Sequence, residues 1–148
     1  MLREWKILLV DDQDYTRQLL RNLLIAVTQH EALKPRKYSY LQANSAMQAR
    51  FMFNLYRPEL VFLDIDLPDG NGLDVLQKLK IDRENCFIVM VSGISTLENV
   101  KTAMSKGAAT FVVKPFNGDK ILSALQLFDK FINERSLPNK SQHPSSPI

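Results

Sequence analysis

The sequence predicts an α/β protein built on a parallel sheet with helices on both faces. Short apolar runs that contain β-branched residues recur along the 148 residues, and each is followed by a segment in which apolar side chains have helical spacing. Strands that alternate with helices form βαβ units, in which neighbouring strands run parallel and the helices cover the sheet. The length fits one domain.

Five strands are expected. Four of them are continuous apolar runs, as buried parallel strands are, whereas the second in chain order mixes in polar residues and is expected at an edge of the sheet. The expected strands are residues 7–10, 38–42, 60–63, 87–91 and 111–113.

Five helices are expected, at residues 14–28, 45–56, 72–80, 96–106 and 118–134. Ser95 and Glu98 have the spacing of a capping box that begins the fourth helix. Gly107 is the residue type that ends a helix, and Asn117 is the expected N-cap of the last one.

Composition excludes several classes of protein. Apolar residues make up 45% and charged residues 24%, which excludes disordered, collagen-like and fibrous chains. Cys86 is the only cysteine, so neither an intrachain disulfide nor a cysteine-rich zinc site can form. No apolar run approaches the roughly 18 residues of a membrane span, and the first residues lack the apolar core of a signal peptide. A soluble, cytoplasmic protein without membrane association is therefore expected. The net charge of +3 comes from scattered residues, so no nucleic-acid contact is expected.

Polar side chains follow the predicted strands at the edge where open parallel sheets bind ligands. Asp11 and Asp12 follow the first strand and Asp64 ends the third, while Ser92 and Lys114 end the fourth and fifth. Each alone has an ordinary interpretation as a capping loop, a turn or a surface lysine. Their occurrence at equivalent strand ends indicates one site.

The carboxylates at this edge indicate a divalent cation. Like charges held within several ångströms cannot all stay ionised without compensation. Mg²⁺ prefers oxygen ligands and typically uses one or two carboxylates while keeping several waters. Together with Lys114 and the Ser92 hydroxyl, such a cation would surround a phosphoryl group, and a carboxylate can itself be the nucleophile that accepts it.

These side chains lie in motifs that are found in a known family. The motifs are Val10-Asp11-Asp12, Leu63-Asp64-Ile65-Asp66-Leu67-Pro68-Asp69-Gly70-Asn71-Gly72, Val91-Ser92-Gly93 and Gly107-Ala108-Ala109-Thr110-Phe111-Val112-Val113-Lys114-Pro115-Phe116. In order and spacing they resemble the receiver domain of two-component response regulators, across residues 5 to about 133. The resemblance implies a flavodoxin-like doubly wound five-stranded sheet with strand order 2-1-3-4-5.

The resemblance implies a role for each acidic residue. Asp64 would be the phosphoacceptor, and it would bind Mg²⁺ together with Asp11 and Asp12. The main-chain carbonyl of Asp66 would be a further metal ligand, so the side chain there need not be one. Lys114 would pair with the phosphoryl oxygens.

Switching is also implied by the resemblance. Ser92 would be the hydroxyl that moves toward the phosphate, and Phe111 would be the aromatic residue whose ring turns inward, although it also suits an ordinary core position. A cis peptide bond would join Lys114 and Pro115.

The implied function is a phosphorylation-dependent signalling switch that changes its partner-binding face. Such a protein is not an enzyme, since it promotes only its own phosphorylation and dephosphorylation. The phosphodonor would be a histidine kinase or phosphotransfer protein. The output would be a downstream protein partner or an output domain beyond this chain, and a phosphorylation-dependent dimer is allowed. Residues 1–134 are expected to form the receiver, and residues 135–148, rich in Pro and Ser, a disordered tail or interdomain linker.

One alternative of a different class is compatible with the same residues. An apolar strand followed by Asp64 and Asp66 also fits a haloacid dehalogenase-like phosphatase, with Asp64 as nucleophile and Asp66 as general acid. That family normally places this motif early and its paired acids late, whereas here the pair Asp11-Asp12 comes first.

Overall fold

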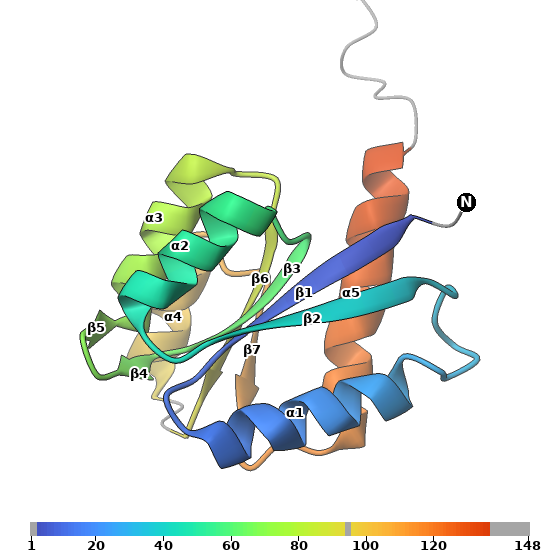
Figure 1. Cartoon of the computed structure of the whole chain (residues 1–148), viewed down its shortest axis with the longest axis horizontal. Coiled ribbons are helices and arrows are strands. Elements are labelled where there is room, and N and C mark those ends of the chain that lie inside the picture. Colours follow the sequence, from blue (N-terminus) through green and yellow to red (C-terminus); the bar gives the residue numbers. More distant parts are fainter. Residues whose placement is uncertain (1–2, 94–95, 137–148) are drawn as a thin grey trace, which may run out of the picture.

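The computed structural model describes residues 3–93 and 96–136. Within these residues a parallel sheet of five strands has the order β2-β1-β3-β6-β7 (Figure 1), which is the 2-1-3-4-5 order expected above. Its strands are β1 (Glu4–Val10), β2 (Lys37–Ala43), β3 (Leu60–Asp64), β6 (Phe87–Ser92) and β7 (Thr110–Val113). The described part contains no helix long and apolar enough to cross a membrane.

The central strands are buried on both faces because successive side chains point to opposite sides of a sheet. In β1, Ile7 and Leu9 belong to one apolar core, while Leu8 and Val10 belong to the other, and none is more than 3% exposed. A strand with both faces buried is apolar throughout, which explains its continuous apolar run. The more polar β2 lies at an edge, as predicted.

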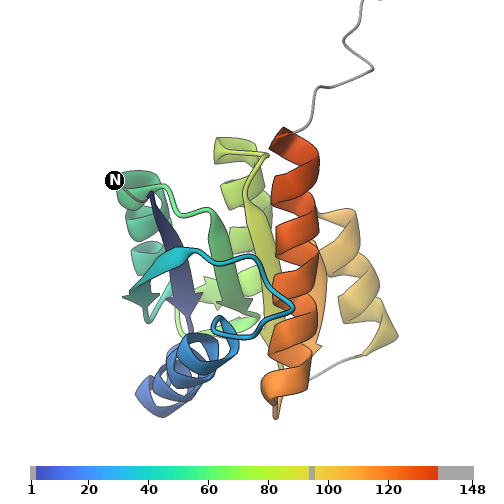
Figure 2. The ribbon, with the colours of Figure 1, turned by 90° about the vertical axis from the view of Figure 1, so that its right-hand side faces the viewer.

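Helices cover both faces of the sheet. α1 (Asp14–Val27) and α5 (Gly118–Ser136) pack on one face, and α2 (Ala46–Tyr56), α3 (Gly72–Asp82) and α4 (Leu97–Ser105) pack on the other (Figure 1). Figure 2 looks onto α5, which lies over β6 and β7. The carboxyl ends of the strands are left open between the two layers.

Local sequence explains where α5 begins and where α4 ends. The Asn117 side chain accepts a hydrogen bond from the Lys120 N–H at 3.0 Å, so it is the N-cap predicted for α5. Gly107 follows α4 with a φ of +104°, and the Ala108 N–H donates to the Ala103 carbonyl at 3.0 Å. This is a Schellman ending, which needs a residue that adopts positive φ without strain.

Two local features differ from the sequence prediction. The N-cap of α4 is Thr96, whose hydroxyl accepts from the Asn99 N–H at 3.1 Å; the predicted cap, Ser95, lies outside the described residues. A short antiparallel pair, β4 (Asp66–Leu67) and β5 (Gly70–Asn71), follows β3 and was not predicted, because two-residue strands carry no periodicity.

Candidate functional site

The loop after β1 presents two acidic side chains at the carboxyl edge of the sheet. The Asp11 N–H donates to the Ala43 carbonyl of β2 at 3.1 Å, which fixes the loop to the sheet. Asp11 is 6% exposed, and its Oδ1 accepts from the Gln13 N–H at 2.9 Å. Asp12 is exposed. The loop therefore holds one carboxylate inside the edge and one toward solvent.

Asp64 ends β3 and is 5% exposed. Among the described residues, the hydrogen-bond contact of its Oδ1 is a long one, 3.4 Å from the Asp66 N–H. The β4–β5 hairpin returns the chain onto the end of β3, where the Gly72 N–H donates to the Ile65 carbonyl at 2.7 Å. The chain passes so close that a Cβ at Gly72 would lie 2.0 Å from the Asp64 carbonyl oxygen.

Lys114 follows β7 and lies between the two buried carboxylates. Its Nζ is 2.7 Å from Asp11 Oδ2 and 3.1 Å from Asp64 Oδ2. The Lys114 N–H donates to the Ser92 carbonyl at 2.8 Å, and the Lys114–Pro115 peptide bond is cis. The site thus joins the ends of β1, β3, β6 and β7.

Burial sets the protonation chemistry of this cluster. Desolvation raises the pKa of Asp64 from 3.8 to about 6; Lys114 acts to lower it, and the Asp11 charge raises it further. Desolvation acts to lower the pKa of Lys114, but the hydrogen bonds and charges of Asp11 and Asp64 outweigh it, and the pKa is raised. Lys114 therefore stays cationic at neutral pH, while Asp64 carries an unusually costly negative charge.

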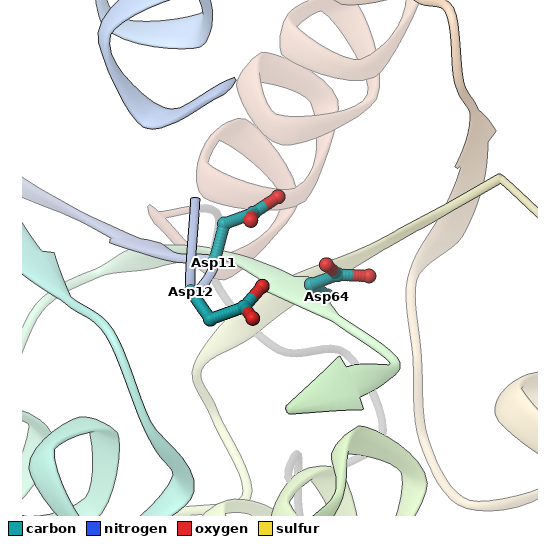
Figure 3. Close-up of side chains that lie close together, drawn as sticks. All are labelled: Asp11, Asp12 and Asp64. Atoms are coloured by element: carbon teal, nitrogen blue, oxygen red, sulfur yellow. The ribbon is translucent and has the colours of Figure 1, made fainter. Parts of the chain in front are cut away.

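The three carboxylates are arranged to hold a cation. One carboxylate oxygen from each of Asp11, Asp12 and Asp64 lies within 4.8 Å of the others, and Figure 3 shows the three side chains gathered at the ends of β1 and β3. Oxygen ligands of one Mg²⁺ are about 4.2 Å apart when they are opposite and about 3 Å apart when they are adjacent, given bonds of 2.0–2.1 Å. The three carboxylates would therefore draw closer together, or bind in part through water, to hold the cation. The donor set of hard oxygens fits a divalent cation.

The other residues predicted for the site lie in or next to the strand ends that form it. Ser92 is 1% exposed at the end of β6 and pairs in register with Val113, next to Lys114. Asp66 is exposed in β4, two residues after Asp64. Phe111 of β7 pairs in register with Met90 of β6. Its side chain is partly buried against the core on the α2–α3–α4 side of the sheet.

Two residues that serve this site were not singled out from the sequence. Arg17 of α1 is buried, and its guanidinium donates to the Asp11 carbonyl at 2.5 Å and to Gln42 Oε1 at 2.9 Å. The signal was its spacing, since it shares a helical face with the buried Leu20 and Leu24. Gly72 was quoted only as part of a motif, although glycine at the first position of a helix indicates a close backbone approach.

Comparison with known proteins gives one consistent family. The sequence model of one protein family, the response regulator receiver domain, matches residues 7–126. Sporulation initiation phosphotransferase F of Bacillus subtilis is 31% identical over 123 residues, covering 83% of this chain and 92% of that protein. The chemotaxis protein CheY of Listeria monocytogenes is 29% identical over 121 residues, covering 82% and 95%.

Solved structures agree with the sequence relatives. NtrX from Brucella abortus has a TM-score of 0.76 at 30% identity, covering 90% of this chain and 29% of that chain. The CheX–CheY–BeF3–Mg²⁺ complex from Borrelia burgdorferi gives a TM-score of 0.70 at 26% identity, covering 82% and 86%.

None of these matches supports the haloacid dehalogenase-like alternative, and the resemblance first seen in four short motifs extends over most of the fold. The chain belongs to the response regulator receiver domain family, whose members are phosphorylation-dependent signalling switches.

Proposed function

We propose that this chain accepts a phosphoryl group on Asp64, with Mg²⁺ held by Asp11, Asp12, Asp64 and the main-chain carbonyl of Asp66. The observation that carries the proposal is the position of Lys114 Nζ, which lies 2.7 Å from Asp11 and 3.1 Å from Asp64. A cation placed beside a buried carboxylate neutralises the charge that a phosphoryl group would bring.

Asp64 is the carboxylate best placed to act as the nucleophile. Both oxygens of Asp11 accept close hydrogen bonds, from the Gln13 N–H and from Lys114. Asp12 is exposed, so it is more strongly solvated and lacks the buried environment of Asp64. Within the described part of the chain, Asp64 Oδ1 accepts just the long 3.4 Å contact from the Asp66 N–H, which leaves that oxygen most available for a new bond.

The transfer conserves atoms and charge. An Asp64 oxygen forms a bond to the phosphorus of a phosphohistidine, the phosphorus–nitrogen bond breaks, and its electron pair returns to the imidazole, which takes up a proton. Mg²⁺, which Asp11, Asp12 and Asp64 would hold, would neutralise charge on the phosphoryl oxygens. Lys114 exchanges its contact with the Asp64 oxygen for one with the phosphoryl group. Attack of water on the phosphorus later breaks its bond to the Asp64 oxygen, releases inorganic phosphate and restores the carboxylate.

The phosphoryl group would then bias the neighbouring face of the molecule. Ser92 is joined through its carbonyl to the Lys114 N–H, and Phe111 lies three residues before Lys114 in the edge strand β7. We assign Ser92 and Phe111 as the switch pair. Movement of the two residues would alter the face formed by α4, β7 and α5, which is where a partner would detect the change. Hydrogen exchange in β7 should therefore change with a phosphoryl mimic, and unchanged protection there would reject this route.

The proposal also names partners for this chain, and composition supplies the domain boundaries. The donor is a histidine kinase or phosphotransfer protein, and the output is a downstream protein or a further domain. The relatives support a regulatory role of this kind. Residues 1–134 are assigned to the receiver and 135–148 to a tail or linker on composition. A cytoplasmic location remains the prediction.

Intact-mass measurement tests the proposal. Incubation with a small phosphodonor and Mg²⁺ should add one labile phosphoryl group to the wild type and none in the presence of a chelator. Asp64→Asn should remove the addition. Asp66→Asn is the matched control, because it makes the same change two residues away at a position where only the main chain is used.

Labelling of Asp64→Asn at the wild-type level would contradict the assignment of the phosphoacceptor. Loss of labelling in Asp66→Asn, with its stability unchanged, would show that this side chain is needed after all.

A further inference from the structure

Helix α2 carries apolar side chains over most of its circumference. Its only polar members are Gln48, Arg50 and Asn54, if the terminal Tyr56 is grouped with the aromatic residues. An amphipathic surface helix has one apolar stripe, and a helix that is apolar all round is normally buried on all sides. In this chain Ala49 and Phe53 already fill the core-facing side.

The opposite side of α2 carries a second stripe of large apolar side chains. Met47 is 76% exposed, Phe51 63% and Leu55 57%. Their spacing of four residues aligns them along one row of the helix. We call Met47, Phe51 and Leu55 the outer stripe.

No described element covers the outer stripe. α2 packs against α3, β1 and β2, which lie on its inner side, and Figure 1 shows its outer side turned away from the sheet. Contiguous apolar patches of this kind mark interaction sites rather than ordinary surface.

We propose that the outer stripe of α2 binds the outer stripe of a second copy of this chain, with the two α2 helices antiparallel. The stripe is symmetric about its centre, since Met47 and Leu55 lie four residues before and after Phe51. In an antiparallel pair Phe51 therefore meets Phe51 of the second copy, and Met47 meets Leu55. A two-fold interface requires this self-complementarity.

Charges at the two ends of α2 favour the same arrangement. The Asp69 carboxylate accepts from the Ala46 and Met47 N–H groups at 2.7 and 3.0 Å, so it lies at the N-terminal end. Arg57 is the exposed C-cap at the other end. Antiparallel packing about Phe51 brings Arg57 of one copy toward the Asp69 end of the other, and it also opposes the two helix dipoles favourably.

The size of the stripe predicts a weak dimer. Three side chains of this type expose on the order of 400 Å² in each copy, against roughly 800 Å² per partner in a standard interface. We therefore expect a dimer that forms at tens to hundreds of micromolar protein rather than an obligate one. Because the stripe is present without a phosphoryl group, the interaction does not depend on the proposed phosphorylation.

Sedimentation velocity over a concentration series tests the proposal. The wild type should shift from monomer toward dimer as concentration rises, and Phe51→Glu should weaken the association by about tenfold or more. Ile81→Glu is the matched control, because Ile81 is also a large apolar side chain, 76% exposed, but lies on α3 and outside the outer stripe. It should dimerise like the wild type. Urea midpoints close to that of the wild type would verify that both variants fold.

Cysteine cross-linking tests the orientation. Phe51→Cys should form a disulfide with itself, and a mixture of Met47→Cys with Leu55→Cys should cross-link more than either variant alone. The native Cys86 is 2% exposed and does not interfere. A wild type that stays monomeric at several hundred micromolar, a dimer that survives Phe51→Glu, or cross-linking of Met47→Cys with itself alone would overturn the proposal.

Discussion

The ionised Asp64 carboxylate should destabilise the protein when no cation is bound. Its pKa of about 6 compares with an ordinary 3.8, and the main cause is desolvation, which Lys114 offsets only in part. A difference of roughly 2 pKa units at 1.36 kcal/mol each corresponds to about 3 kcal/mol. That is the net cost of holding the charge at this site after the attraction of Lys114 has been included.

The size of this effect depends on pH. Below about pH 3.8 the carboxyl is protonated in both the folded and the unfolded chain, so the cost is absent. Between pH 3.8 and 6 the unfolded chain releases the proton first, and the free energy of unfolding falls as pH rises. Above pH 6 both states are ionised and the folded state carries the full cost.

Replacing Asp64 by Asn imitates the neutral carboxyl in shape. We expect Asp64→Asn to raise the free energy of unfolding in chelator by up to about 3 kcal/mol at pH 7.5 and to change it little at pH 4. Urea titrations of both proteins at these two pH values measure the difference. Added Mg²⁺ should narrow the gap at pH 7.5, because it stabilises the wild type by binding the folded state.

Two results would refute the reasoning. Asp64→Asn could prove less stable than the wild type at pH 7.5, which would mean that the charge is stabilising there. A gain of equal size at both pH values would mean that it does not come from ionisation. Asp66→Asn, at an exposed position, is the control and should change the free energy of unfolding little.

Three further substitutions test other parts of the site. Gly72→Ala should cost about 3 kcal/mol in urea unfolding and reduce phosphorylation, since its Cβ would lie 2.0 Å from a backbone oxygen, whereas Gly70→Ala, with 3.6 Å to its nearest neighbour, should be tolerated. Arg17→Met should weaken Mg²⁺ binding in calorimetry by about tenfold, because the guanidinium no longer holds the carbonyl of the metal loop; unchanged affinity would remove Arg17 from the site. Asp12→Asn should raise metal-free stability by about 0.5 kcal/mol, at the low end for stabilising changes because the side chain is exposed, and should lose most of the stabilisation by Mg²⁺. Equal stabilisation of Asp12→Asn and the wild type by Mg²⁺ would show that this residue is not a ligand.

The sheet and its polar edge could be predicted because they depend on simple periodicities. Apolar runs mark β1, β3 and the edge strand β7, so the ends of these strands could be predicted from the sequence, and with them the positions of Asp11, Asp64 and Lys114. The open edge of a parallel sheet then brings these ends together whatever their separation in sequence. The Lys114 contacts with the two carboxylates follow from that topology.

Other features depend on contacts that local patterns do not encode. Both Ser95 and Thr96 have suitable cap side chains, and the capping-box spacing from Ser95 to Glu98 favoured the wrong one. The spacing of Arg17 places it on the buried face of α1, but its hydrogen bond to the Asp11 carbonyl depends on the path of the loop after β1, which the spacing does not encode. The role of Gly72 appears only when the β4–β5 hairpin places it against the end of β3.

Chemical trapping of the phosphorylated residue tests the central claim most directly. Borohydride reduces an acyl phosphate to the alcohol, so an aspartyl phosphate becomes homoserine and can be located by peptide mass mapping. After reaction with a small phosphodonor and Mg²⁺, we expect homoserine at position 64 alone. Homoserine at Asp11, Asp12 or Asp66, or a phosphorylated chain with none at Asp64, would contradict the proposed mechanism.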